Sequence, residues 1–267
     1  IQTPILEHGA LFERTVATSD IVTKEMFKLQ KRGKEEGQGE DVIVLRPEGT
    51  APVVRAFLEQ GWGQSLPRKL FYQGPMFRYD RPQKGRLRQF HQLGIEWLGF
   101  DAPWADVELI ACAWDFLASL GCIEGLVLEI NTIGTAQERM LYRQKLQDFF
   151  RPQAAHLSQD SQARLETNPL RILDSKNPQD QELAQKAPLL EGSLGSESRT
   201  FFEDVLQGLE VLNIPYQVNP RLVRGLDYYD HTTFEIKAAS LGAQSTVLAG
   251  GRYQGLVKML GGPDVPG

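Results

Sequence analysis

The residues from Lys69 to Phe100 hold the densest charged feature of the sequence, KLFYQGPMFRYDRPQKGRLRQFHQLGIEWLGF. Two strand-like runs flank a loop in which a single acid, Asp80, faces five cations: Arg78, Arg81, Lys84, Arg86 and Arg88. Pro82 and Gly85 are residues typical of turns. Guanidinium groups bind phosphate and carboxylate bidentately, so this hairpin suits a polyanion. The alternative is a solvated charged turn, which is what most charge runs are.

The strand that returns from this loop has two different faces, because side chains alternate with a period of two. One face carries His91, Leu93, Ile95 and Trp97, and we expect this face to be buried. The other carries Phe90, Gln92, Gly94 and Glu96. It offers an aromatic platform for a base, and an amide and a carboxylate for a small polar cation. A half-exposed strand with scattered polar residues remains the alternative.

The segment LRPEGT, from Leu45 to Thr50, joins a predicted strand to a predicted helix and places Glu48 on the turn. Pro47 stiffens this turn and Gly49 permits tight geometry, so the carboxylate is held ready for binding. Alternatively, Glu48 only places a negative charge near a helix N-terminus. We expect Thr50 to cap that helix.

Two further segments combine cations with phenols. LVRGLDYYDHTTFEI, from Leu222 to Ile236, places Arg224 shortly before Tyr228 and Tyr229, which can donate and accept hydrogen bonds. AGGRY, from Ala249 to Tyr253, adds two glycines where backbone could approach a ligand, followed by another Arg–Tyr pair. Packing tyrosines and a simple glycine turn are the corresponding alternatives.

The composition excludes several classes of protein. The 267 residues are 41% hydrophobic and 24% charged, which fits a globular protein of one or two domains. No apolar run approaches the roughly 18 residues of a membrane helix, and we expect a soluble, unsecreted protein. The four histidines lack metal-site spacing, so we expect no protein metal site, and Cys112 and Cys122 are expected to be structural. A net charge of −5 still permits local basic patches.

Helices and strands of ordinary length are predicted around these groups. The patterns predict helices over 50–59, 105–120 and 197–212, and strands over 42–45, 70–77, 89–99, 126–131, 216–223, 231–237 and 245–249. The stretch 135–198 is rich in Gln, Lys, Glu and Ala and predicts a helical insertion. The strands mostly precede and follow the insertion without regular βαβ spacing. This order of elements favours an α+β fold, an antiparallel β-sheet flanked by helices, over a doubly wound parallel sheet. The expected domains are therefore 1–134, 135–198 and 199–267.

These motifs together resemble the histidyl-tRNA synthetases, a family of class II aminoacyl-tRNA synthetases. The run FRxxRPQKGRxRQFHQLGxE, from Phe77 to Glu96, resembles their motif 2. LRPEGT, RLVRGLDYY from Arg221 and AGGRY resemble the histidine-specific signatures, and TNPLRILDSKNP from Thr167 resembles the insertion domain. The resemblance covers residues 5–267 with the motifs in matching order, and it implies a class II synthetase-like sheet.

The resemblance implies a two-step reaction, in which histidine and ATP give histidyl-adenylate and the histidyl group passes to tRNA(His). It implies that Arg78 and Arg224 are catalytic, Arg224 replacing a metal ion used by other class II enzymes. The implied ATP site is Arg78, Asp80, Arg86 and Phe90, and the implied tRNA contacts are Arg81 and Lys84. The implied histidine site is Glu48, Gly49, Thr50, Arg78, Gln92, Glu96, Arg224, Tyr228, Tyr229 and Tyr253.

The implied partners are L-histidine, ATP with Mg²⁺, tRNA(His) and a second copy in a cytoplasmic homodimer, without a membrane. The sequence begins late in the motif 1 region and ends before motif 3 and the anticodon-binding domain. We therefore expect the chain by itself to bind histidine better than ATP and to aminoacylate poorly. The main rival is a histidine-sensing regulatory subunit of ATP phosphoribosyltransferase. Such paralogues tend to lose the catalytic arginines, whereas Arg78, Arg86 and Arg224 are present here. A tRNA-sensing module attached to another domain is a third possibility.

Overall fold

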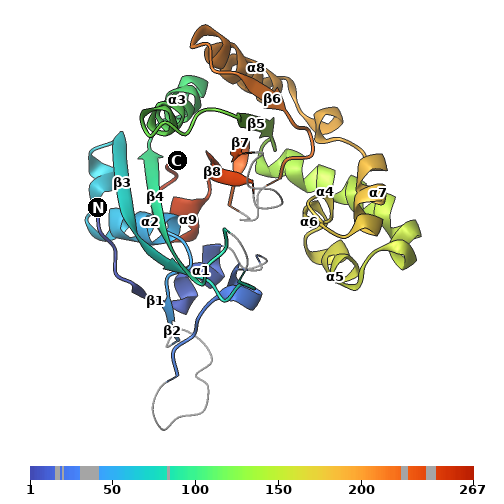
Figure 1. Cartoon of the computed structure of the whole chain (residues 1–267), viewed down its shortest axis with the longest axis horizontal. Helices are drawn as coiled ribbons and strands as arrows, with labels where there is room; N and C mark the ends of the chain where they lie inside the picture. Colours follow the sequence, from blue (N-terminus) through green and yellow to red (C-terminus); the bar gives the residue numbers. More distant parts are fainter. Residues whose placement is uncertain (16–18, 20, 31–41, 83–84, 224–227, 239–244) are drawn as a thin grey trace. The chain divides into compact units, whose positions relative to one another are not determined.

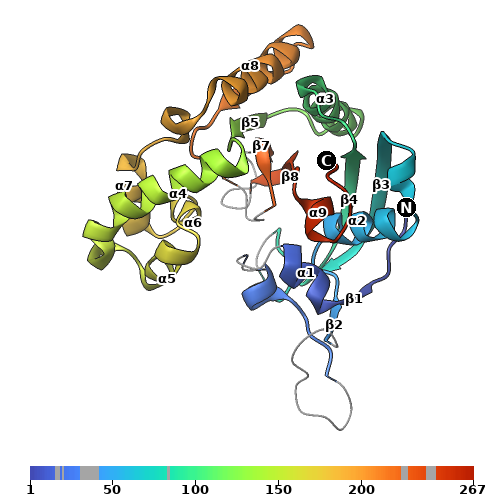
Figure 2. The same ribbon diagram turned by 180° about the vertical axis from the view of Figure 1, so that it is seen from behind.

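A computed structural model describes residues 1–15, 19, 21–30, 42–82, 85–223, 228–238 and 245–267. The chain forms two compact units. The first comprises Ile1–Asp101, Leu226–Tyr228 and Tyr253–Gly267, and the second comprises Ala102–Gly225 and Tyr229–Arg252. Figures 1 and 2 label the elements of both units from opposite sides. Each unit contains helices and antiparallel strands, as the α+β prediction requires. Within the described residues, no helix is both long and apolar enough to cross a membrane.

The first unit is built on two antiparallel strand pairs. Strands β1 (Leu6–His8) and β2 (Ile43–Leu45) form the short pair, and β3 (Arg68–Phe77) and β4 (Gln89–Leu98) form the long hairpin. Helix α2 (Thr50–Glu59) follows β2 and coincides with its prediction. The remaining helical segments are α1 (Gly9–Thr15), η1 (Ile21–Glu25), η2 (Trp62–Gln64) and α9 (Leu256–Met259).

Helix α2 covers one face of the hairpin. Val53 of α2 packs with Tyr72 and Met76 of β3, and Phe90 of β4 lies against this small core. Tyr72 pairs with Gly94 across the two strands. A β-carbon at Gly94 would collide with the Tyr72 ring, so the glycine is needed for this close approach.

The expected burial of β4 is reversed in the structure. Leu93, on the face that we expected to be buried, is 52% exposed, whereas Glu96 on the opposite face is only 7% exposed. Phe71 on β3, which pairs with Ile95, is also exposed. The prediction of two distinct faces was right, but the covered face is the more polar one because α2 and Tyr72 lie on that side.

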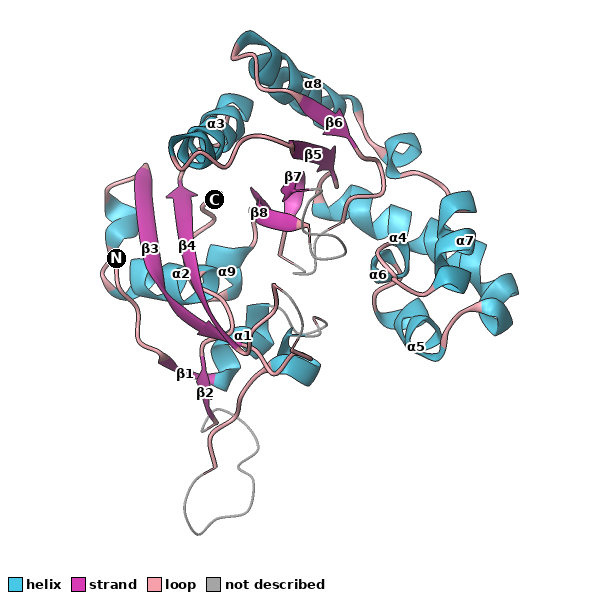
Figure 3. Cartoon of the chain, viewed as in Figure 1, coloured by secondary structure: helices cyan, strands magenta, loops and turns pink. Residues whose placement is uncertain are grey.

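The second unit contains a four-stranded sheet in the order β6, β5, β7, β8, drawn as magenta arrows in Figure 3. These strands are β5 (Leu126–Thr132), β6 (Tyr216–Val218), β7 (Asp230–Ala238) and β8 (Thr246–Arg252). β7 is antiparallel to both neighbours, and β6 is parallel to β5. Strand β6 ends earlier than predicted because Asn219 starts a turn, accepting the backbone N–H groups of Arg221 and Leu222.

Two long helices complete the core of this unit. Helix α3 (Pro103–Ser119) packs against α8 (Ser196–Val211), and both helices contribute to one apolar cluster with the sheet. Ile110, Val205, Leu128 and Ile236 are fully buried members of this cluster. The predicted helices and strands therefore form the core that their apolar periodicity indicated.

The chain between β5 and α8 is helical, and every residue from 133 to 195 is described. Its segments are α4 (Ala136–Phe150), η3 (Arg151–His156), α5 (Gln159–Thr167), α6 (Leu170–Leu173), α7 (Pro178–Lys186) and η4 (Leu190–Ser193). The Glu138 carboxylate accepts the Thr135 N–H at 2.7 Å and the Ser198 hydroxyl at 2.7 Å, which joins the start of α4 to the start of α8. The domain boundaries at 134 and 198 stay predictions.

Asp180 is the polar centre of the helical stretch. Its fully buried carboxylate accepts the Ser158 N–H at 2.8 Å. It also accepts the hydroxyls of Ser158, Ser161 and Ser175, each at 2.6 Å. Burial opposes the charge, but these donors more than compensate and hold the pKa of Asp180 below its ordinary value. One side chain therefore joins the beginnings of α5 and α7.

We predict that Asp180→Ala lowers the free energy of unfolding by about 2–4 kcal/mol, because it leaves three hydroxyls without their charged acceptor. The contribution of Asp180 should be full above the ordinary aspartate pKa of about 3.9 and be lost as the pH falls through the lower folded value. Urea unfolding at pH 7 and pH 3 measures both effects. The exposed Glu182→Ala on the same helix is the control, and an equal loss in both variants would contradict the prediction.

Candidate active site

Glu48 lies at the junction between β2 and α2, and its side chain is 4% exposed. Its carboxylate accepts the backbone N–H of Thr50 at 2.7 Å and of Ala51 at 3.0 Å. Glu48 therefore caps α2, and the expected cap by Thr50 was wrong. The N-cap position belongs to Gly49, and the Thr50 hydroxyl has another partner. Burial raises the pKa of Glu48, against the opposing effects of these two N–H groups and Arg78.

Glu96 brings together three of the predicted histidine-site residues. The Thr50 hydroxyl donates to one carboxylate oxygen of Glu96 at 2.8 Å, and the Tyr253 hydroxyl donates to the other at 2.8 Å. Burial, with a smaller contribution from the charge of Glu48, raises the pKa of Glu96 to about 7 despite these two donors. A carboxyl group that titrates near neutral pH in a polar buried site is typical of functional sites.

Arg78 follows β3 and lies beside the Glu48 turn. Its Nε donates to the Pro47 carbonyl at 2.8 Å, and its guanidinium carbon lies 5.2 Å from the Phe90 ring centroid. Burial lowers the pKa of Arg78, although Glu25 and Glu48 oppose this effect. Its terminal nitrogens have no acceptor among the described residues. They are thus available for an anion close to the buried Glu48 carboxylate.

The other predicted histidine-site residues differ in their placement. The Tyr228 and Tyr253 rings meet edge to face, with centroids 5.6 Å apart. Gly49 lies against the Tyr72 ring, which leaves no space for a β-carbon, and Gln92 is half-buried opposite Gly74. Tyr229 belongs to the second unit, where its ring lies against Gly251.

Two predicted functional cations lie outside the described residues, namely Arg224 and Lys84. In the loop after β3, the Asp80 carboxylate pairs with Arg86 at 2.5 Å and accepts the Arg81 N–H at 2.7 Å. Both members of this ion pair were predicted to bind ATP. The side chain of Arg81 is exposed, as a contact to a large ligand would require.

Arg252, the cation of the AGGRY segment, is buried and paired with an acid. It is 3% exposed, and its guanidinium donates to both oxygens of Asp106 at 2.7–3.2 Å and to the Ala102 carbonyl at 3.1 Å. The pair joins β8 to the start of α3 within the second unit. Tyr253, the next residue, is the one that contacts Glu96.

A metal centre has no support in the described part of the chain, where no group of three or more His, Cys, Asp or Glu side chains could hold an ion. His231 is buried, and its pKa is lowered by that burial and by Arg252. Its ring stacks on Phe201 with centroids 4.9 Å apart. Sequence reasoning missed one buried cation, Arg46, because a single arginine at a strand end forms no motif.

The chain also matches proteins of known family. The family model described as histidyl-tRNA synthetase matches residues 1–266. The chain belongs to the histidyl-tRNA synthetase family. It is 54% identical over its whole length to a histidine–tRNA ligase of Parasynechococcus marenigrum, of which it covers 60%. It is 50% identical over 265 residues to the ligase of Gluconobacter oxydans, covering 62% of that protein.

Solved structures support the same assignment. The apo histidyl-tRNA synthetase of S. aureus matches the whole chain with a TM-score of 0.75 and 37% identity, and 60% of that structure is covered. A structure described as an ATP phosphoribosyltransferase regulatory subunit/histidyl-tRNA synthetase from Bacillus halodurans matches with a TM-score of 0.64 and 25% identity, with 70% covered. The chain thus has a class II synthetase fold and spans about 60% of the length of the curated relatives it matches.

The raised pKa of Glu96 makes stability depend on pH. Between the ordinary pKa of 4.5 and about 7, Glu96 binds more protons in the folded state than in the unfolded state, so its contribution to stability falls as the pH rises through this window. We predict that Glu96→Gln flattens this fall, because a neutral amide has no desolvation cost of ionisation. Chemical unfolding at pH 5 and pH 8 should show a relative gain of roughly 3 kcal/mol for the variant at pH 8.

The matched control is Glu129→Gln in the second unit. Lys237 donates to the Glu129 carboxylate at 2.8 Å, and the pKa of Glu129 is lowered, so its removal should not flatten the fall between pH 5 and pH 8. Parallel pH curves for the wild type and Glu96→Gln would contradict the assigned state of Glu96.

Proposed function

We propose that the protein is a histidine–tRNA ligase that activates L-histidine with ATP and transfers the histidyl group to tRNA(His). The observation that carries the proposal is the buried Glu96 carboxylate, held between the hydroxyls of Thr50 and Tyr253. It lies in a chain that is 54% identical to a histidine–tRNA ligase. By the same family membership, we infer a cytoplasmic homodimer as the working form.

Recognition of the imidazole ring is the role we assign to Glu96. The ring carries N–H donors, and a buried carboxylate beside two hydroxyls offers acceptors that an apolar isostere would leave unpaired. Tyr228 would close the pocket through its edge-to-face contact with Tyr253. From the motif matches alone, we also assign Tyr229 to the imidazole, and Gln92 and Gly49 to the binding of histidine.

The proposed site offers one acidic and one basic group, which suit the ammonium and the carboxylate of an amino acid. Glu48 and Thr50 would bind the ammonium group, and Arg78 would bind the carboxylate. The Glu48 carboxylate already accepts two backbone N–H groups, one at each oxygen. Each oxygen keeps a further lone pair for the substrate. The terminal nitrogens of Arg78 supply donors in the fork geometry that a carboxylate requires.

The activation step needs no nucleophile from the protein. An oxygen of the histidine carboxylate attacks the α-phosphorus of ATP, the bond to the bridging oxygen breaks, and pyrophosphate leaves. ATP enters as its magnesium complex. Arg78 and Arg224 would stabilise negative charge at the α-phosphoryl group, while Arg86 and Asp80 would order the remaining phosphates and Phe90 would stack on the adenine.

The transfer step joins the histidyl group to the terminal adenosine of the tRNA. A ribose hydroxyl attacks the histidyl carbonyl, the mixed anhydride bond breaks, and AMP leaves with the bonding electrons. Arg81 and Lys84 on the hairpin loop would contact the acceptor end, where phosphate contacts position the substrate. The helical stretch 135–198 is the proposed insertion domain.

A histidine-sensing regulatory subunit of ATP phosphoribosyltransferase is the second candidate, because one matching structure is described as an ATP phosphoribosyltransferase regulatory subunit/histidyl-tRNA synthetase. Its 25% identity is well below the 54% shared with the ligase of Parasynechococcus marenigrum. A sensor needs the imidazole pocket but not a cation for the α-phosphate. The terminal guanidinium nitrogens of Arg78, which have no acceptor among the described residues, therefore favour the ligase.

Histidine-dependent ATP–pyrophosphate exchange by the complete protein that carries this chain tests the proposal. We predict that Arg78→Ala and Arg224→Ala each lower the exchange rate by about 10²–10³-fold, because each removes a cation from the developing charge. Circular dichroism should show that the fold is retained. The surface variant Arg151→Ala is the control, since Arg151 pairs with Glu166 on the exposed helical stretch. Histidine binding without exchange in the wild type would favour the sensor.

A further inference from the structure

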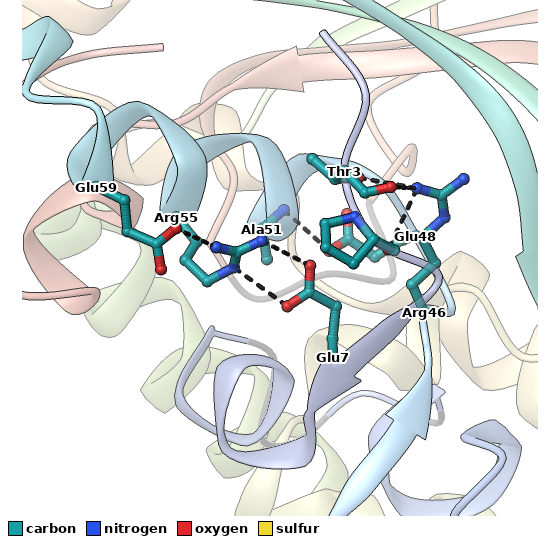
Figure 4. Close-up of polar contacts among 8 residues, drawn as sticks. Thr3, Glu7, Arg46, Glu48, Ala51, Arg55 and Glu59 are labelled. Carbon is teal, nitrogen blue, oxygen red and sulfur yellow. Dashed lines mark hydrogen bonds and ion pairs between the residues drawn. The ribbon is translucent and has the colours of Figure 1, made fainter.

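Arg46 is a buried cation whose contacts with described residues are all to uncharged groups. Its side chain is 4% exposed. Nη1 donates to the Thr3 carbonyl at 2.7 Å, the Thr3 hydroxyl at 2.9 Å and the Pro4 carbonyl at 3.4 Å, and Nε donates to the Pro75 carbonyl at 2.9 Å. Figure 4 shows Arg46 beside Thr3 and the Glu48 turn. Burial lowers its pKa, and the opposing charge of Glu7 comes from an acid already paired with Arg55.

Burying a guanidinium on carbonyl groups is costly, and stability alone gives little reason for it. Its fork instead reaches separate segments at once: the N-terminal residues Thr3 and Pro4, and β3 at Pro75. Gly74 adds to this fit, because a β-carbon there would collide with Nη2 of Arg46. Gly74 therefore leaves room for Nη2 in this arrangement.

The Arg46 side chain adds one contact to a row of hydrogen bonds between the segment that carries Glu48 and the segment that carries Arg78. Along the segment that carries Glu48, the Arg46 carbonyl accepts the Phe77 N–H at 3.0 Å and the Pro47 carbonyl accepts Nε of Arg78 at 2.8 Å. The bond from Arg46 to Pro75 completes this row of contacts between residues 46–47 and 75–78. Glu48 comes directly after residues 46–47, and Arg78 is the last residue of the segment 75–78.

We propose that Arg46 is a positioning residue that sets the spacing between the Glu48 carboxylate and the Arg78 guanidinium. This spacing decides whether one ligand can satisfy both groups, with its ammonium at Glu48 and its carboxylate at Arg78. The inference rests on the proposed function for the identity of the ligand. Arg46 itself touches no substrate, and its effect passes through the 46–47 to 75–78 contacts.

The test compares two ligands that differ at one end. L-histidine carries both the ammonium and the carboxylate, whereas L-histidinol keeps the ammonium and the imidazole but lacks the carboxylate. A ligand with only one of these two charged groups binds without depending on the distance between Glu48 and Arg78. In the complete protein, Arg46→Met should weaken histidine binding by about 10–100-fold and histidinol binding by less than about 3-fold, as misplaced binding groups do. Isothermal titration calorimetry measures both affinities.

Arg55→Met is the matched control. Arg55 on α2 also joins separate segments, donating to Glu7 at 2.9 Å and pairing with Glu59, as Figure 4 shows. Its loss should lower the thermal midpoint and leave the ratio of histidine to histidinol affinity unchanged. Should Arg46→Met fail to fold, Arg46→Lys keeps the charge but loses the fork, and it is expected to change the ratio in the same direction.

Each outcome decides the proposal. A selective loss of histidine affinity in the Arg46 variants supports it. Equal losses for both ligands show a general structural role and overturn it, and so does an unchanged histidine affinity. A wild-type protein that neither binds histidine nor catalyses exchange would instead contradict the proposed function.

Discussion

Thr50 joins two buried carboxylates, and the candidate site depends on this arrangement. Its backbone N–H donates to Glu48 at 2.7 Å and its hydroxyl donates to Glu96 at 2.8 Å. Burial raises the pKa of both acids, so two negative charges close together carry a desolvation cost that neutral donors offset only in part. A ligand with a cationic group and N–H donors would supply the missing compensation, and histidine has both.

The surrounding elements serve to hold these acids in place. Glu48 caps α2, so the helix and the binding group share one set of hydrogen bonds. Tyr72 packs against both Gly49 and Gly94, which brings the Glu48 turn close to the strand that carries Glu96. If the acids bind the proposed ligand, a substitution that relaxes them should stabilise the empty protein and weaken binding.

The sequence allowed most elements, and the strand face that carries Glu96, to be predicted. Period-two alternation correctly put Phe90, Gln92, Gly94 and Glu96 on one face, but not which face is covered, since apolar content does not show where α2 packs. The contact of Tyr253 with Glu96 spans 157 positions, and no local pattern indicates it. The pairing of Arg252 was not indicated by any local pattern either, because its partner Asp106 lies 146 positions away.

The ionisation of Glu96 is the most direct test of its role, and carbon NMR of protein labelled at the glutamate carboxyl carbon can follow it, with Glu96→Gln to assign the resonance. We predict a midpoint of about 7 in the free protein. We also predict a downward shift of that midpoint when L-histidine binds, because a donor-bearing ligand favours the carboxylate. A midpoint near the ordinary glutamate value of 4.5, or a midpoint that histidine leaves unchanged, would contradict it.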